Sequence, residues 1–323
     1  MMPTFQYIKV KQVKEGVKQL STAGAKIQAG GTDLLGCLRD RVFPVEKVVS
    51  INGIRDLRGI SDKGGVLRIG ALTTITEVAE NPQISQLFPG LARAAGEVAS
   101  PQLRNQGTIG GNICQKPRCW YYRGEFHCTR KGGDICFAYS GENQYHCLFG
   151  GAGCYIVHPS DTAPVLAALE ARVGVIGPKG ARIIKMDEFF MPPAMDPTRE
   201  TVLGGQEMVT EILIPLPRPG LKSSYRKVRA RRSWDFALAG AALALNFEGP
   251  RVVKARVFLS GVAPVPWRAK EVEEVITGRE LTAGTIARAG MVAIKKAEPL
   301  SKNGYKVPLL QAVIEEELEA IRQ

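Results

Sequence analysis

Ala29-Gly30-Gly31-Thr32-Asp33-Leu34-Leu35 is the stretch that decides the fold, because it follows directly on a predicted strand at 26–29. Only glycine lets backbone N–H groups approach an anion closely, and the Thr32 hydroxyl adds a donor. A second such turn, Thr108-Ile109-Gly110-Gly111-Asn112, follows later in the chain. A single Gly-Gly pair usually marks only a tight turn, but two can hold one pyrophosphate between them. Neither has the G-x-G-x-x-G pattern, so a Rossmann fold is not indicated.

The second turn leads into a segment rich in cysteine. Residues 118–161 contain all three histidines and five of the seven cysteines, which are Cys119, Cys128, Cys136, Cys147 and Cys154. Gly, Asp, Asn and Lys lie between these thiols, so the segment cannot bury much apolar surface. We therefore expect a metal or a cluster held by thiolates to order it, since the binding free energy then becomes folding free energy.

Three interpretations compete for the thiols. Disulfides are disfavoured because the cysteine count is odd and residues 1–10 lack the apolar core of a signal peptide, so we expect a reducing cytoplasm. Structural zinc usually takes close C-x2-C to C-x4-C pairs, and none occurs here. The closely spaced ferredoxin pattern is equally absent. The spacing predicts a metal site and leaves the metal open.

Composition narrows the class of protein. A chain of 323 residues with 45% apolar and 23% charged residues is typical of a soluble protein of two domains. No apolar run is long enough for a membrane-spanning helix. The net charge of +12 is compatible with nucleic acid, an acidic ligand or an acidic partner subunit. Because no nucleic-acid-binding motif accompanies the basic cluster at 227–232, we do not expect nucleic acid as a partner.

The order of elements predicts an α+β protein. The first domain, 1–215, mixes strands and helices, and the Pro-rich residues 215–220 are expected to link it to the rest. Residues 221–323 then form the second domain. It is expected to contain an antiparallel meander at 225–230, 241–247 and 252–262, followed by helices at 268–277, 283–297 and 307–322.

The two Gly-rich turns, followed by His158-Pro159-Ser160-Asp161, resemble the FAD-binding (medium) subunit of molybdenum hydroxylases, the group of xanthine dehydrogenase, carbon monoxide dehydrogenase and aldehyde oxidoreductases. The resemblance spans nearly the whole chain. It implies a two-part FAD-binding domain of the PCMH/vanillyl-alcohol-oxidase type, then a smaller C-terminal domain of antiparallel sheet plus helices.

A subset of that family, including 4-hydroxybenzoyl-CoA reductase and aldehyde oxidoreductases, is similar and carries an inserted loop with a [4Fe–4S] cluster. Residues 118–122 and 153–161 match the two ends of that loop, which implies an insertion at about 113–156. Cys119, Cys136 and Cys154 match the cluster ligands in every variant of the loop. The resemblance favours Cys128 as the fourth ligand, with Cys147 as the alternative.

The resemblance also implies the flavin contacts. Backbone N–H groups and hydroxyls of the two turns would surround the FAD pyrophosphate, through Ala29, Gly30, Gly31, Thr32, Asp33, Leu34, Leu35, Thr108, Gly110, Gly111 and Asn112. Asp161 would hold ribityl or ribose hydroxyls. Lys227 and residues 231–237 lie either at the isoalloxazine edge, where a cation raises the flavin potential, or on a solvated basic surface facing an acidic subunit. Cys37 and Cys114 are expected to be buried apolar residues, and His127, His146 and His158 to be structural or to contact the cluster ligands.

The expected function is that of the flavin subunit of a heteromeric molybdenum hydroxylase, with no catalytic acid or base in this chain. Its implied partners are a large molybdenum-cofactor subunit, a small subunit with two [2Fe–2S] clusters, and an external electron acceptor or donor such as NAD, ferredoxin, quinone or oxygen. Two alternatives remain open. One is a free-standing FAD oxidoreductase, and the other is a zinc-stapled, basic nucleic-acid-binding protein.

Overall fold

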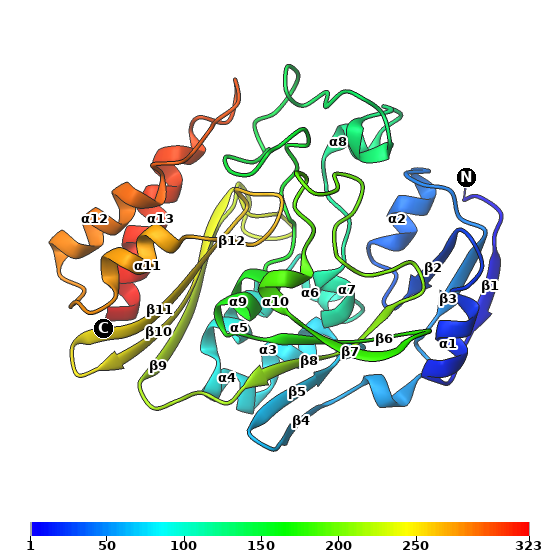
Figure 1. Cartoon of the computed structure of the whole chain (residues 1–323), viewed down its shortest axis with the longest axis horizontal. Helices are drawn as coiled ribbons and strands as arrows, with labels where there is room; N and C mark the ends of the chain where they lie inside the picture. Colours follow the sequence, from blue (N-terminus) through cyan, green and yellow to red (C-terminus); the bar gives the residue numbers. More distant parts are fainter. Residues whose placement is uncertain (1, 323) are drawn as a thin grey trace.

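A computed structural model describes residues 2–322 of the chain and shows three sheets side by side, with an irregular segment above them (Figure 1). The first sheet is parallel with the order β1-β3-β2. A short helix follows β1, and its Val13 and Val17 pack against the core of this part. The elements of this part are β1 (Gln6–Lys9), α1 (Val13–Gln19), β2 (Ala25–Gln28), α2 (Leu34–Arg39) and β3 (Lys47–Ser50).

The second sheet is antiparallel, with the order β4-β5-β8-β6-β7. Its elements are η1 (Arg55–Leu57), β4 (Ile60–Lys63), β5 (Val66–Gly70), α3 (Ile75–Glu80), α4 (Pro82–Leu87), α5 (Pro89–Gly96), α6 (Pro101–Arg104), α7 (Ile109–Ile113), α9 (Thr162–Ala168), β6 (Arg172–Gly177), β7 (Gly180–Lys185), α10 (Met186–Phe189) and β8 (Met208–Pro215).

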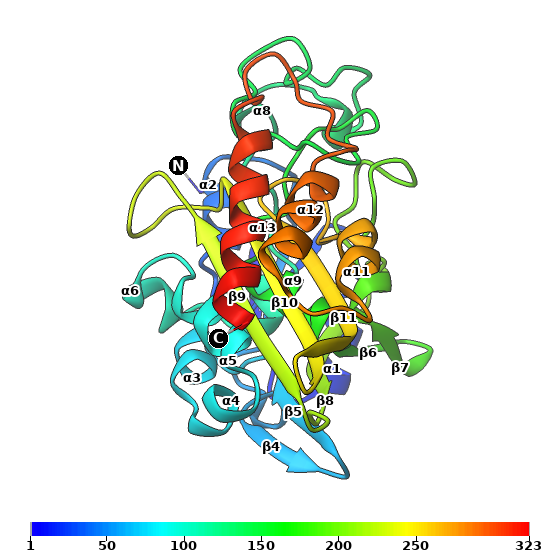
Figure 2. The same ribbon diagram turned by 90° about the vertical axis from the view of Figure 1, so that its left-hand side faces the viewer.

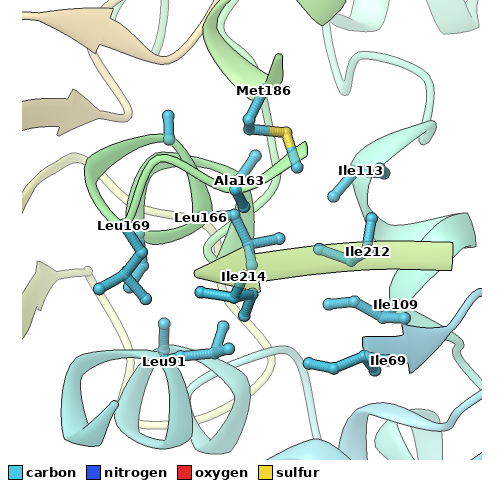
Figure 3. Packing of buried hydrophobic residues seen from close by; sticks show 14 of the residues in the cluster. Ile69, Leu91, Ile109, Ile113, Ala163, Leu166, Leu169, Met186, Ile212 and Ile214 are labelled. Atoms are coloured by element: carbon cyan, nitrogen blue, oxygen red, sulfur yellow. The ribbon is translucent and has the colours of Figure 1, made fainter. Parts of the chain in front are cut away.

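Apolar residues at alternate positions of β8 place the main core. Ile212 and Ile214 are fully buried, while Glu211 before them and Leu213 between them are only partly buried, as expected for a strand with one face on the core. Figure 3 shows both isoleucines among buried side chains of the surrounding helices, including Leu91 of α5 and Leu166 of α9. The helices that carry the second Gly-rich turn and Asp161 are fixed by this packing.

The third sheet is an antiparallel meander with the order β12-β11-β10-β9, and Figure 2 shows its helices on one face. Leu310, Ile314 and Leu318 of its last helix are buried on that face, as the spacing predicts. The opposite face packs Tyr225 and Phe258 into the main core. The elements are β9 (Leu221–Val228), β10 (Ala239–Glu248), β11 (Arg251–Ser260), β12 (Trp267–Arg268), α11 (Lys270–Ile276), α12 (Ala283–Ala293) and α13 (Lys306–Arg322).

Residues 113–156, the predicted insertion, lie in the connection between α7 and α9. The helical turns within this connection are α8 (Trp120–Arg123) and η2 (Thr129–Lys131). The α+β class is confirmed. Within residues 2–322, no helix combines the length and the apolar character needed to cross a bilayer. Among the short helices that the sequence did not predict, α2 begins inside the first Gly-rich turn at Leu34 and α7 contains most of the second turn.

Candidate functional site

Both Gly-rich turns line one cavity of about 680 Å³. It lies between the first sheet, the second sheet with its helices, and the segment that joins β9 to β10. The predicted flavin contacts in its wall are Ala29, Gly30, Gly31, Thr32, Asp33, Leu34, Thr108, Gly110, Gly111, Asn112 and Asp161. The structure therefore brings together all the predicted contacts except Leu35 and Lys227, which lie outside the wall.

The first Gly-rich turn packs directly against the backbone of Gln106, just before the second turn. A Cβ atom at position 30 would lie 1.9 Å from the carbonyl oxygen of Gln106, so only glycine fits there. Gly31 has a φ of 75°, in the left-handed region. Within residues 2–322, the N–H groups of Gly31, Thr32 and Asp33 donate to no acceptor. These groups remain available for an anion at the cavity wall.

The second turn differs, because its N–H groups are already in use. The Gly110 N–H donates to the Ala71 carbonyl at 3.0 Å, and the Gly111 N–H donates to Thr108 Oγ1 at 3.2 Å. The Asn112 side chain accepts from Ser160 Oγ at 2.5 Å and from Thr162 Oγ1 at 2.7 Å. The second turn is therefore fixed to the segment that carries Asp161. It shapes the cavity wall but has no free N–H donor at Gly110 or Gly111 for an anion.

Asp161 is buried and fully engaged. Its carboxylate accepts from Tyr225 Oη at 2.8 Å and from Lys227 Nζ at 2.7 Å. Burial raises the pKa of Asp161, and the hydrogen-bonded Lys227 and Tyr225 oppose that rise. Lys227, whose side chain is fully buried, also donates to the Glu97 carbonyl at 3.2 Å. Lys227 lies behind Asp161, so Asp161 is the member of the pair that faces the cavity.

The segment that joins β9 to β10 contributes residues that the sequence named only as part of a basic cluster. Trp234 and Phe236 line the cavity from this side. The Trp234 N–H donates to the Ala99 carbonyl at 2.9 Å, and its φ of 53° is unusual for a residue with a side chain. The guanidinium of Arg118 lies 5.1 Å from the centre of the Phe236 ring. Arg118, which belongs to the insertion, therefore connects the insertion to this segment.

Asp33 connects the first turn to the insertion. It accepts from the Lys116 N–H at 2.7 Å, from Arg123 Nη2 at 2.7 Å and from Arg118. Burial would raise the pKa of the Asp33 carboxyl, but Arg118 and Arg123 outweigh it, so the pKa lies below its ordinary value of 3.8. Chemically, Asp33 is an anchor for residues 116–123 at the edge of the cavity.

Replacement of Asp33 by asparagine is expected to destabilise the protein by about 1.5–3 kcal/mol at pH 7, because the carboxylate holds two guanidinium groups. Since the folded pKa is lowered, this contribution exists above the ordinary carboxyl pKa and disappears as the pH falls through the folded value. Urea unfolding of wild type and Asp33→Asn at pH 7 and at low pH measures the difference. Asp62→Asn, at an exposed position, is the control, and an equal effect at both pH values would contradict the prediction.

A second, small cavity lies in the insertion, and four of its wall residues are Cys119, Cys128, Cys136 and Cys154. Cys147 is buried but lies outside this wall. Within residues 2–322 the thiols are free, and no three Cys, His, Asp or Glu side chains are close enough to hold a single metal ion. Four of the five thiols that the sequence singled out therefore line one cavity.

The environment of these thiols is mostly apolar but includes His146 and Arg130, of which sequence reasoning missed Arg130. Burial raises the pKa of the Cys119 thiol to about 12, so an ionised thiolate needs a metal or another cation beside it. His146 Nε2 lies 3.3 Å from Cys119 Sγ, and the buried Arg130 also lines the cavity. No local pattern in the sequence identifies Arg130, because its partner is distant in the chain.

Cys37 and Cys114 both line the larger cavity, and neither lines the cavity of the four thiols, although Cys37 packs in one apolar cluster with Cys128. Burial raises the pKa of Cys37 to about 11 and that of Cys114 to about 12, so both are neutral, unreactive thiols. His158 is buried against the Phe190 ring, 4.6 Å between ring centres, and burial lowers its pKa to about 3. Cys37 and His158 are buried, whereas Cys114, which was also expected to be buried, has intermediate exposure.

The fold and the larger cavity define an α+β protein with a Gly-rich binding site for an anionic ligand. Known proteins make this specific. Residues 3–217 match the family described as FAD binding domain in molybdopterin dehydrogenase, and residues 223–316 match the CO dehydrogenase flavoprotein C-terminal domain. The chain therefore belongs to the family of FAD-binding subunits of molybdopterin dehydrogenases, and is an FAD-dependent oxidoreductase subunit of the molybdenum hydroxylase type.

Individual relatives agree. The chain is 33% identical over 320 residues to the aldehyde oxidoreductase FAD-binding subunit PaoB of Escherichia coli, covering 97% of this chain and 96% of the relative. It is 31% identical over 300 residues to the carbon monoxide dehydrogenase medium chain of Hydrogenophaga pseudoflava, covering 92% and 88%. The solved carbon monoxide dehydrogenase of that organism superposes with a TM-score of 0.80 at 29% identity, covering 99% of this chain and 98% of the other. The predicted family and FAD are confirmed, and the zinc-stapled alternative loses its support.

Proposed function

We propose that this chain carries electrons between iron–sulfur groups and an external acceptor or donor through FAD. Substrate chemistry would take place at a molybdenum cofactor in a large subunit, and a small subunit with two [2Fe–2S] clusters would supply or receive the electrons. Relatives described as medium chains or medium subunits of dehydrogenases and a hydroxylase support the heteromeric assembly. The predicted cytoplasmic location belongs to the same proposal.

For the flavin, the proposal assigns the pyrophosphate to the first turn, because the Gly31, Thr32 and Asp33 N–H groups are available there. Asp161 faces the cavity from the opposite wall and would accept from flavin hydroxyls, with Lys227 and Tyr225 holding its carboxylate in place. FAD, when bound, supplies a group that exchanges electrons both singly and in pairs. The chain's own residues bind and orient it, and none is assigned a proton-transfer role.

The observation that carries the proposal is that two sites in one chain are joined directly. Asp33 belongs to the first Gly-rich turn, and the Arg118 that binds it immediately precedes Cys119 in the wall of the thiol cavity. Only Arg118 would therefore stand between Asp33, a proposed flavin contact, and Cys119, a ligand of a group bound by Cys119, Cys128, Cys136 and Cys154. We propose a [4Fe–4S] cluster there, which supplies one-electron redox chemistry when bound.

Metal, sulfide and flavin analysis of anaerobically purified protein tests this proposal. We expect about four iron and four sulfide per FAD. Cys128→Ser is expected to lose most of the iron, because Cys128 lines the cavity, and Cys147→Ser, its matched control, to keep it. Iron loss only in Cys147→Ser would reverse the assignment of the fourth ligand. Wild-type protein with flavin and no iron would overturn the cluster.

A further inference from the structure

Arg130 places a positive charge in the wall of the thiol cavity. It follows Cys128 by two positions, in η2 (Thr129–Lys131), and only 2% of its side chain is exposed. Its guanidinium lies 5.8 Å from the centre of the Tyr122 ring. Arginine remains protonated in proteins. Among the cavity-lining residues that the structure describes, Arg130 is the one whose side chain carries a permanent charge.

The partners of Arg130 lie outside the insertion and fix its position. Its Nη2 and Nε atoms donate to Glu200 Oε1 at 2.7 and 3.2 Å, and its Nη1 atom donates to the Pro197 carbonyl at 2.7 Å. Glu200 also pairs with Lys116. Two positive charges therefore share the Glu200 carboxylate, and of the two only Arg130 is buried, since 31% of the Lys116 side chain is exposed.

A buried positive charge shifts the reduction potential of a nearby redox centre in a direction that electrostatics predicts. A cluster bound by four thiolates becomes more negative when it accepts an electron, and a nearby cation stabilises the reduced form more than the oxidised form. The effect is large where water is scarce, because the local dielectric is low. Net charge around a cluster is one of the factors that set its reduction potential.

We propose that Arg130 raises the reduction potential of the cluster held by Cys119, Cys128, Cys136 and Cys154, and that Glu200 moderates this effect. The inference rests on the cluster proposed above. The step concerned is the uptake of one electron by the oxidised cluster from a reductant, with no bond made or broken and no proton transferred. Arg130 would thereby help to decide whether electrons rest on the cluster or on the flavin.

Redox titration of the complete, anaerobically purified complex, followed by electron paramagnetic resonance, tests the proposal. Arg130→Gln is expected to shift the cluster to a lower potential, because the charge is removed while a hydrogen-bonding side chain remains. Arg130→Lys, which keeps the charge, should remain close to wild type. Glu200→Gln should shift the potential upward, because it leaves both Arg130 and Lys116 uncompensated. Shifts of opposite sign separate an electrostatic role from a merely structural one.

Iron content distinguishes the possible failures. An unchanged potential in Arg130→Gln protein that retains its iron would overturn the proposal. Should Arg130→Gln lose its iron, Glu200→Gln decides, and an unchanged or lowered potential there overturns the proposal. A wild-type complex without iron overturns the proposed cluster and this inference with it, whereas iron-loaded variants with unchanged potentials overturn only the inference.

Discussion

Gly30→Ala protein is expected to purify with its FAD content reduced about tenfold or more, which corresponds to a loss of at least ~1.4 kcal/mol of binding free energy. The added Cβ would lie 1.9 Å from the Gln106 carbonyl oxygen and 2.7 Å from its carbon. Both are backbone atoms, so neither can move aside as a flexible side chain would. The first turn must separate from the chain that leads into the second turn, and the N–H groups of Gly31 and Thr32 move with it.

The ratio of flavin absorbance to protein, measured after purification and again after addition of FAD, checks this prediction. Gly96→Ala is the matched control, because position 96 is exposed at the end of α5 and a Cβ there meets no atom within 4 Å. The control should bind FAD as wild type does. A Gly30→Ala protein with full flavin occupancy would show that the close approach of the two turns is not needed for binding.

The larger cavity could be predicted from the sequence because its determinants are local. A strand followed by Gly30-Gly31 is visible in a few residues, and the glycines have no side chain whose contacts need to be known. The alternating pattern of β8 and the helical pattern of α13 were visible for the same reason. The short helices α2 and α7 were not, since each has about one turn and contains glycine, which has a low helix propensity.

The smaller cavity could be predicted only in part. Spacing identified five candidate thiols but could not separate Cys128 from Cys147, because that choice depends on how an irregular segment folds back on itself. The contacts that fix the segment come from distant positions, such as Glu200 on Arg130 and Asp33 on Arg123. No periodicity reports such pairs. Local patterns in the sequence therefore cannot predict the part of the structure that long-range ion pairs decide.

The strongest of these distant contacts comes from α13, where Lys306 is fully buried. Its Nζ atom donates to the Gly261 carbonyl at 2.8 Å, and to the carbonyls of Tyr145 and His146 at 3.0 and 3.2 Å. Burial lowers the pKa of Lys306 to about 7. The side chain therefore fastens the insertion, at the residues just before Cys147, to the C-terminal sheet and helices.

Lys306→Met is expected to lower the free energy of unfolding by about 2–5 kcal/mol, because it leaves buried carbonyls without a donor. Within residues 2–322, the carbonyls of Tyr145 and Gly261 have no other donor, whereas that of His146 keeps Asn303 Nδ2 at 3.1 Å. Methionine matches the length of the lysine stem, so lost packing contributes little. Urea unfolding at neutral pH measures the change.

Lys302→Met is the matched control for this substitution. Lys302 lies four residues before Lys306, its side chain is 48% exposed, and it pairs with Glu142, whose side chain is 57% exposed. A surface pair of this kind contributes less than about 1 kcal/mol, so the control should unfold close to wild type.

If both variants lost the same small amount of stability, the carbonyls around Lys306 would have found water, and the attachment of the insertion to α13 would not depend on this side chain. If only Lys306→Met is destabilised, the insertion is held from two sides, by Asp33 at the flavin turn and by Lys306 at the C-terminal domain, and the cavity between them is fixed by long-range contacts.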